Sequence, residues 1–172
     1  MATNKVLVSL GTQILFGSEV GDDVAWSNET LSDNAGRWSA LHDLGAGPRT
    51  DWFSIEFWGQ CQATPTIGAI VRTAVQAGGS ETATPDHKDH DDGGDVAVST
   101  LDKFMSAFHH PPPMAVNEAA ANIEYVARDV FKFPFRHIGV GSFNESGATT
   151  TTDAAEMKAR LTPLTPDIAA AA

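Results

Sequence analysis

The sequence predicts an all-β protein: an antiparallel β-sandwich that is jelly-roll-like, with long loops and at most one short helix. Three observations predict this class. Short apolar segments with strand-like alternation recur along the chain, turn signals rich in Gly, Pro, Asn and Asp separate them, and long polar excursions join some of them. Long connections between strands are typical of a Greek-key sandwich rather than of a simple meander.

The N-terminal part combines short strands with turns. The expected strands cover residues 5–10, 12–16 and 40–43, and the expected loop and turn cover residues 18–23 and 33–36. Trp26 and Trp38 are expected to anchor the core or a loop.

The strongest strand signal lies at residues 50–62. Phe53, Ile55, Phe57 and Cys61 share one face at period two, while Trp52 and Trp58 lie on the opposite face among polar residues. A second strand is expected at 67–77, and the two strands are predicted to form a hairpin across the A-T-P-T connection.

The next segments carry the strands that close the sandwich. Residues 117–128 fit a short helix, but the alternation from Glu124 onward favours a strand. Pro134 then marks an edge, a bulge or a strand entry, because proline has no N–H for a ladder. A further strand follows at 136–143, and the N-E-S-G turn after it ends with Gly147, a residue favoured for its backbone freedom.

The predicted organisation is one domain at residues 1–152, interrupted by an irregular polar excursion at 80–118. The three prolines at 111–113 are expected to act as a rigid spacer over an end of the sandwich. Residues 153–172 are expected to form a C-terminal arm or a flexible tail, with a short helical turn at its start.

Composition excludes some partners. The net charge is −11 and the eleven Lys and Arg residues are scattered, so nucleic-acid binding is disfavoured. No segment reads as a signal peptide or a membrane span, and the single cysteine excludes an internal disulfide. We therefore expect a soluble protein made in the cytoplasm, without membrane contact.

No residue is assigned to catalysis, to a cofactor or to a metal. Residues 85–95 hold His87, His90 and five aspartates, a set that suits a divalent cation and would fit a metal-dependent hydrolase or isomerase. The favoured interpretation is a solvated loop, because the spacing matches neither an EF-hand nor a zinc helix. Cys61 is expected to be a buried small apolar residue and His137 a structural one, and no nucleophile or phosphate-loop motif occurs.

Trp52 and Trp58 are the candidate interface residues. Three interpretations stay open for them: packing under a covering loop, a subunit interface, or stacking against sugar rings.

Three segments together resemble small tailed-bacteriophage decoration, or cement, proteins of the capsid surface. They are D-W-F-S-I-E-F-W-G-Q (51–60), T-I-G-A-I-V-R-T-A-V (66–75) and F-P-F-R-H-I-G-V-G-S-F-N-E-S-G-A (133–148). The residues that match the late strand and turn of that family are Arg136, Ile138, Val140, Asn144, Ser146, Gly147 and Ala148.

The resemblance implies a jelly-roll fold and a non-enzymatic virion protein on the outer capsid surface. It implies the major capsid protein as partner, a homo-oligomer with a trimer favoured, no cofactor, and stabilisation by bridging capsid subunits. The alternative is a carbohydrate-binding sandwich that attaches to a host or surface glycan through Trp52 and Trp58.

Overall fold

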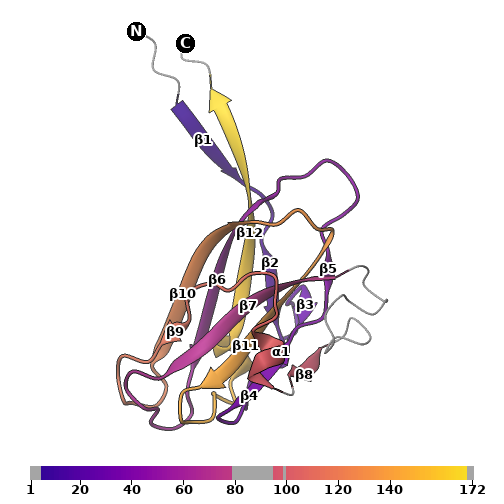
Figure 1. Ribbon diagram of the computed structural model, residues 1–172. Coiled ribbons are helices and arrows are strands. Elements are labelled where there is room, and N and C mark those ends of the chain that lie inside the picture. The colour runs from indigo at the N-terminus through magenta and orange to yellow at the C-terminus, as the bar shows by residue number, and fades with distance from the viewer. Residues whose placement is uncertain (1–4, 79–94, 99, 170–172) are drawn as a thin grey trace.

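Two β-sheets pack face to face in the computed structural model, which describes residues 5–78, 95–98 and 100–169 (Figure 1). Sheet A contains β1 (Lys5–Leu10), β2 (Ile14–Gly17), β3 (Val24–Ala25), β6 (Trp52–Gln60), β10 (Glu124–Lys132) and β12 (Lys158–Ala169). Sheet B contains β4 (Ala35–Trp38), β5 (His42–Asp43), β7 (Ile70–Gly78), β8 (Val96–Val98), β9 (Met114–Ala115) and β11 (His137–Glu145). The helical elements are α1 (Leu101–Phe104) and the 3-10 turn η1 (Ala154–Glu156).

The strand order is that of a jelly roll, as the sequence predicts. Sheet A contains the order β10-β6-β12-β2, and sheet B contains the order β9-β7-β11-β4. The chain pairs with itself like one long rolled hairpin, in which β2 meets β12, β4 meets β11, β6 meets β10 and β7 meets β9. All these pairs are antiparallel, whereas the short β3 adds to β2 in parallel.

The core lies between the two sheets. On β6 the predicted alternation is confirmed, because Phe53, Ile55 and Phe57 are buried while the residues between them face outward. Ile138 and Val140 of β11 are buried in the same cluster from the opposite sheet. Cys61, at the end of the β6 row, is buried too, and burial raises the pKa of its thiol although Ser146 lies within hydrogen-bond distance.

The predicted hairpin of residues 50–62 and 67–77 is wrong. β6 pairs with β10 and β12 in sheet A, whereas β7 pairs with β11 and β9 in sheet B. The two strands face one another across the core instead of sharing a ladder. The connection of residues 61–69 is long enough to cross between the sheets, and each strand buries one apolar row there.

The C-terminal segment enters the sandwich. Residues 158–164 of β12 pair with β6 on one side, and residues 159–161 pair with β2 on the other, so the sandwich extends beyond residue 152. Only η1 matches the short helical turn expected at the start of the tail. The remainder of β12 leaves the body and pairs with β1, and together they form a two-stranded arm that projects from the sandwich (Figure 1).

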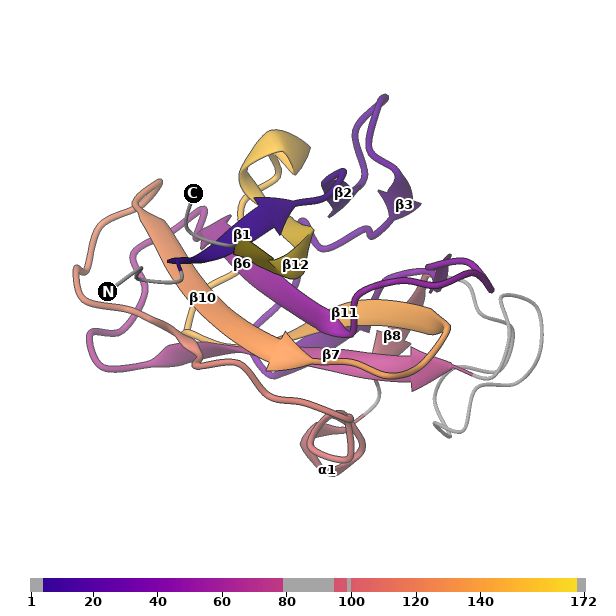
Figure 2. The same cartoon turned by 90° about the horizontal axis from the view of Figure 1, so that it is seen from above.

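The outer face of sheet B is covered by the segment that contains α1 (Figure 2). Phe104 of α1 stacks on Trp38 with ring centroids 5.0 Å apart, and both side chains are fully buried. Trp38 lies so close to β11 that a Cβ on Gly141 would come within 2.2 Å of its ring. The absence of a side chain at Gly141 therefore makes room for Trp38.

The three prolines do not cross an end of the sandwich. His109 exchanges backbone hydrogen bonds with Val75, and β9 pairs with β7 a few residues later. Residues 111–113 therefore run along the edge of β7, where Pro112 accepts a hydrogen bond from Thr73. His109 also contacts Asp129 of β10 at 2.8 Å, so this segment links the edges of the two sheets.

The N-E-S-G turn is organised by Asn144. Its buried side chain donates hydrogen bonds to the carbonyl oxygens of Leu31 and Ala148 and accepts one from the amide of Ser146. Gly147 has a φ of 76°, the left-handed region that favours glycine. The fold role predicted for this turn is confirmed.

Candidate interaction surface on sheet A

The outer face of sheet A carries the two candidate tryptophans. The register aligns its outward residues in rows across β10, β6 and β12. The first row is Val126, Trp58 and Lys158; the second is Arg128, Glu56 and Arg160; the third is Val130, Ser54 and Thr162; the fourth is Lys132, Trp52 and Leu164. This face is exposed along β10 and at Trp52, whereas Lys158 and Thr162 on β12 are buried, Lys158 beneath Glu19 and Asp22.

An ion-pair row divides this face. Glu56 on β6 accepts hydrogen bonds from Arg128 on β10 and from Arg160 on β12. Burial alone would raise the pKa of Glu56, but the two guanidinium groups outweigh it and hold the pKa below its usual value. Glu56 is therefore the shared anion of two arginines, one of which, Arg128, leaves 73% of its side chain exposed.

The two tryptophans differ in how freely they can meet a partner. Trp52 is 45% exposed. Trp58 is only partly exposed, its indole N–H lies 3.3 Å from the carbonyl oxygen of Ala155, and the guanidinium of Arg160 lies 6.0 Å from its ring centre. The rings belong to positions six apart on one strand, about 20 Å. A single sugar ring therefore cannot stack on both.

Exposed apolar side chains gather on the same side. Val126, Val130 and Trp52 from the sheet, with Val8 and Leu10 from the arm, make up half of the large apolar residues that are exposed among the described positions. A hollow of about 390 Å³ runs between Leu10, Val130 and the Arg128–Glu56–Arg160 row. A smaller one of about 190 Å³ lies on the other side of that row, beside Trp58 and Val126. We call this surface the sheet A face.

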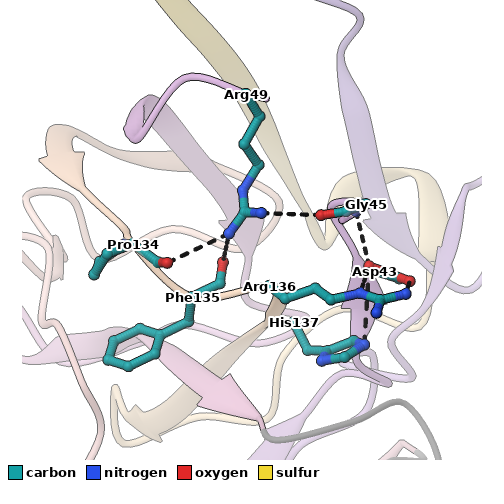
Figure 3. A network of polar contacts seen from close by, with 7 residues as sticks. All are labelled: Asp43, Gly45, Arg49, Pro134, Phe135, Arg136 and His137. Carbon is teal, nitrogen blue, oxygen red and sulfur yellow. Dashed lines mark hydrogen bonds and ion pairs between the residues drawn. The ribbon is translucent and has the colours of Figure 1, made fainter. Parts of the chain in front are cut away.

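A second polar cluster joins β5 and the loop after it to the crossing from β10 to β11 (Figure 3). Arg136 pairs with Asp43 and keeps the pKa of that carboxyl well below its usual range, with help from the amide of Gly45. Arg49 donates to the backbone carbonyls of Gly45, Pro134 and Phe135. These charges hold the crossing from β10 to β11 in place, and His137 is buried beside them, 3.9 Å from Asp43.

The remaining predicted candidates fall elsewhere. His87 and His90 lie outside the described residues, and Asp95 at the end of that segment binds Arg37 at 2.6 Å and the amide of Ser27. Among the described residues, no group of three or more His, Cys, Asp or Glu could hold a metal ion. Within the same residues, no helix has the length and apolar character needed to cross a membrane.

Fold and surface together define a jelly-roll sandwich in which the segment of α1 covers sheet B, while the exposed part of sheet A combines aromatic, aliphatic and arginine side chains. Exposed apolar patches of this composition mark interaction sites. Comparison of the chain with protein-family models, with curated proteins and with solved structures finds no match.

The sequence identified the two tryptophans of this face but missed the Arg128–Glu56–Arg160 row. These residues are spread over 104 positions of the chain, and only the register of three strands brings them together. The alternating pattern of β10 carried a partial signal, since it placed Arg128 on the same face as Val126 and Val130.

Proposed function

We propose that this chain is a structural protein of a virion that decorates and stabilises the capsid outer surface by bridging subunits of the major capsid protein. The observation that carries the proposal is the exposed part of the sheet A face, which joins Trp52 to exposed aliphatic side chains and to Arg128. Trp and Arg are the residues that most often anchor protein interfaces. The sandwich would serve as the rigid support of this face.

Charge favours an acidic partner surface. The chain as a whole has a net charge of −11, yet the exposed ions of the sheet A face include Arg128 and Lys132, with 73% and 59% of their side chains exposed. Arg128 pairs with Glu56 and Lys132 lies 3.9 Å from Asp51, yet both cationic side chains reach solvent and can meet the carboxylates of an acidic partner. On a symmetric lattice, many such modest contacts add up by avidity.

Stabilisation follows from mass action. A protein that binds the assembled lattice but not the free capsid subunits shifts the equilibrium toward the assembled state. The trimer expected from the resemblance remains a prediction, and the arm gives a different indication, argued in the next subsection.

The test is binding to particles that lack this protein. Particles assembled from the major capsid protein alone are incubated with the purified chain, and co-sedimentation and the temperature of particle disruption are measured. The wild-type chain should co-sediment in a fixed ratio and raise that temperature.

Paired variants locate the contact. The double variant Trp52→Ala with Arg128→Ala should reduce co-sedimentation at least about tenfold, because the loss of even one interface anchor has an effect of this size. The matched control is Ile67→Ala with Arg72→Ala, since Ile67 is 64% exposed and Arg72 also pairs with a glutamate, Glu145, in sheet B. Equal loss in both pairs, or no binding by the wild-type chain, would refute the docking proposal.

The carbohydrate alternative is tested on the same proteins. Retention on a glycan array that is lost in Trp52→Ala, together with no binding to capsid particles, would replace the capsid proposal by glycan attachment. The distance between Trp52 and Trp58, and the contacts that hold the ring of Trp58, favour a protein partner over a glycan.

A further inference from the structure

We infer that the free edge of β1 is a self-association surface, at which a second copy of this chain adds its own β1 in antiparallel orientation. The arm consists of β1 and the end of β12, paired from Lys5↔Ala169 to Leu10↔Leu164, and within the part of the chain that the structure describes no other strand pairs with β1. It projects from the sandwich (Figure 1). The inference concerns the arm alone and does not depend on a capsid partner.

The backbone directions identify which groups are open. The amide of Gly11 donates to the carbonyl oxygen of Pro163, so odd-numbered residues of β1 face β12. The hydroxyl of Thr50 donates to the carbonyl oxygen of Leu164, so even-numbered residues of β12 face away from β1. Because backbone groups alternate along a strand, the N–H and C=O groups of Val6, Val8 and Leu10 point to the free edge of β1.

The two edges of the arm are not equivalent. On β12, the open edge beyond Leu164 carries Pro166, which has no N–H to offer. On β1, residues 5–10 (K-V-L-V-S-L) contain neither a proline nor a charge beyond Lys5. Proline and charge are the usual means of blocking an exposed edge. The chain therefore blocks one edge of the arm and leaves the other open.

The open edge is also apolar. Val8 is 55% exposed and Leu10 is 69% exposed. A two-stranded ribbon is marginally stable in water by itself, so an added strand would stabilise the arm as well as the contact.

Charge favours a second copy as the occupant. The arm contains one Lys and one Asp, Lys5 and Asp167, and so contributes no net charge to a chain of −11. It is the projecting part at which two such acidic molecules can meet with least repulsion. If the two β1 strands pair about Val8, then Val8 lies opposite Val8 of the second copy and Leu10 lies opposite Val6 of the second copy. Aliphatic residues then meet aliphatic residues.

This pairing closes at two copies. Both copies use the same edge, which makes the contact isologous and produces a two-fold dimer with a four-stranded ribbon in the order β12, β1, β1, β12. It differs from the trimer that the resemblance implies.

The experiment measures the mass of the full chain by sedimentation equilibrium over a range of concentrations. A wild-type dimer, twice 18.2 kDa, is expected. Val8→Pro removes a donor only from the free edge and should weaken the dimer at least about tenfold, since the central backbone hydrogen bonds are lost from both copies. Leu10→Lys, which charges the same edge, should act likewise.

Two controls separate this contact from others. Ile67→Lys charges an exposed apolar position of the body, and Trp52→Ala alters the sheet A face; both should leave the dimer intact. In hydrogen exchange, the amides of Val8 and Leu10 should gain protection as the protein concentration rises. A monomer at every concentration, a trimer, or a dimer that survives Val8→Pro and Leu10→Lys would overturn the inference.

Discussion

At the scale of single residues, a few side chains carry constraints that the surrounding fold depends on. Asn144 binds three backbone groups from two segments, and Gly141 makes room for Trp38. The sequence predicted the turn that contains Asn144 from its residue types. The contact of Gly141 could not be predicted, because Trp38 belongs to another strand and only the register Gly141↔Trp38 reveals it.

Asn144→Ala should lower the free energy of unfolding by about 3 kcal/mol, because three buried hydrogen bonds to the backbone of Leu31, Ser146 and Ala148 are lost. Asn117→Ala is the control, since Asn117 is exposed, and a change below about 0.5 kcal/mol is expected there. Urea unfolding measures both. Similar losses in the two variants would contradict the role of Asn144.

Gly141→Ala should destabilise the protein by about 2 kcal/mol, the usual cost of overpacking. Its Cβ would lie 2.2 Å from the ring of Trp38, and Trp38 cannot move because Phe104 stacks on it. Gly47→Ala should be close to neutral, since nothing lies within 4 Å of a Cβ there. Thermal unfolding of both variants gives the comparison.

At the scale of elements, sequence periodicity predicted the long strands before residue 150, including β7 and β11, which are buried over most of their length. β6 and β10 alternate regularly and were expected at nearly their observed positions. β12 was missed because Pro163 and Pro166 interrupt its pattern, which normally argues against a strand. In the structure, Pro163 lies where one extra residue bulges between β1 and β2, and Pro166 faces an open edge. At neither position does the ladder need a backbone N–H, which proline lacks.

Truncation after residue 152 should abolish folding, because it removes the strand between β6 and β2 and exposes both as new edges. Near-ultraviolet circular dichroism of the truncated chain should lose the tryptophan signals of the full chain. A folded, cooperative fragment would restore the domain boundary at 152 that the sequence suggested.

The ion-pair row predicts a pH dependence in the acid range. The pKa of Glu56 is lower in the folded state than in the unfolded state. Its contribution to stability is therefore fully present above the unfolded-state pKa of about 4.3 and is lost as the pH falls through the folded-state pKa. The variant Glu56→Gln should therefore be less stable than wild type at pH 7. The difference should shrink as the pH falls below about 4, measured by denaturant titration. A constant difference would contradict the pairing.

At the scale of the whole molecule, the sheets are unequal: sheet B is covered by the segment of α1, and sheet A is exposed along β10 and at Trp52. Period and turn signals were enough to predict a jelly-roll-like sandwich. They could not assign strands to sheets, because two strands show the same alternation whether they pair as a hairpin or face one another across the core. β6 and β7 were predicted to pair and instead lie in different sheets. The open face and the arm together give the molecule one side suited to contact.

The most direct test of the capsid proposal is the protein content of purified virus particles from the source that encodes this chain. Quantitative mass spectrometry should find the chain in a fixed ratio to the major capsid protein, and mild removal of the chain should lower the temperature at which the particles break. Particles that contain no copy of the chain, or that keep the same heat tolerance without it, would contradict the proposal.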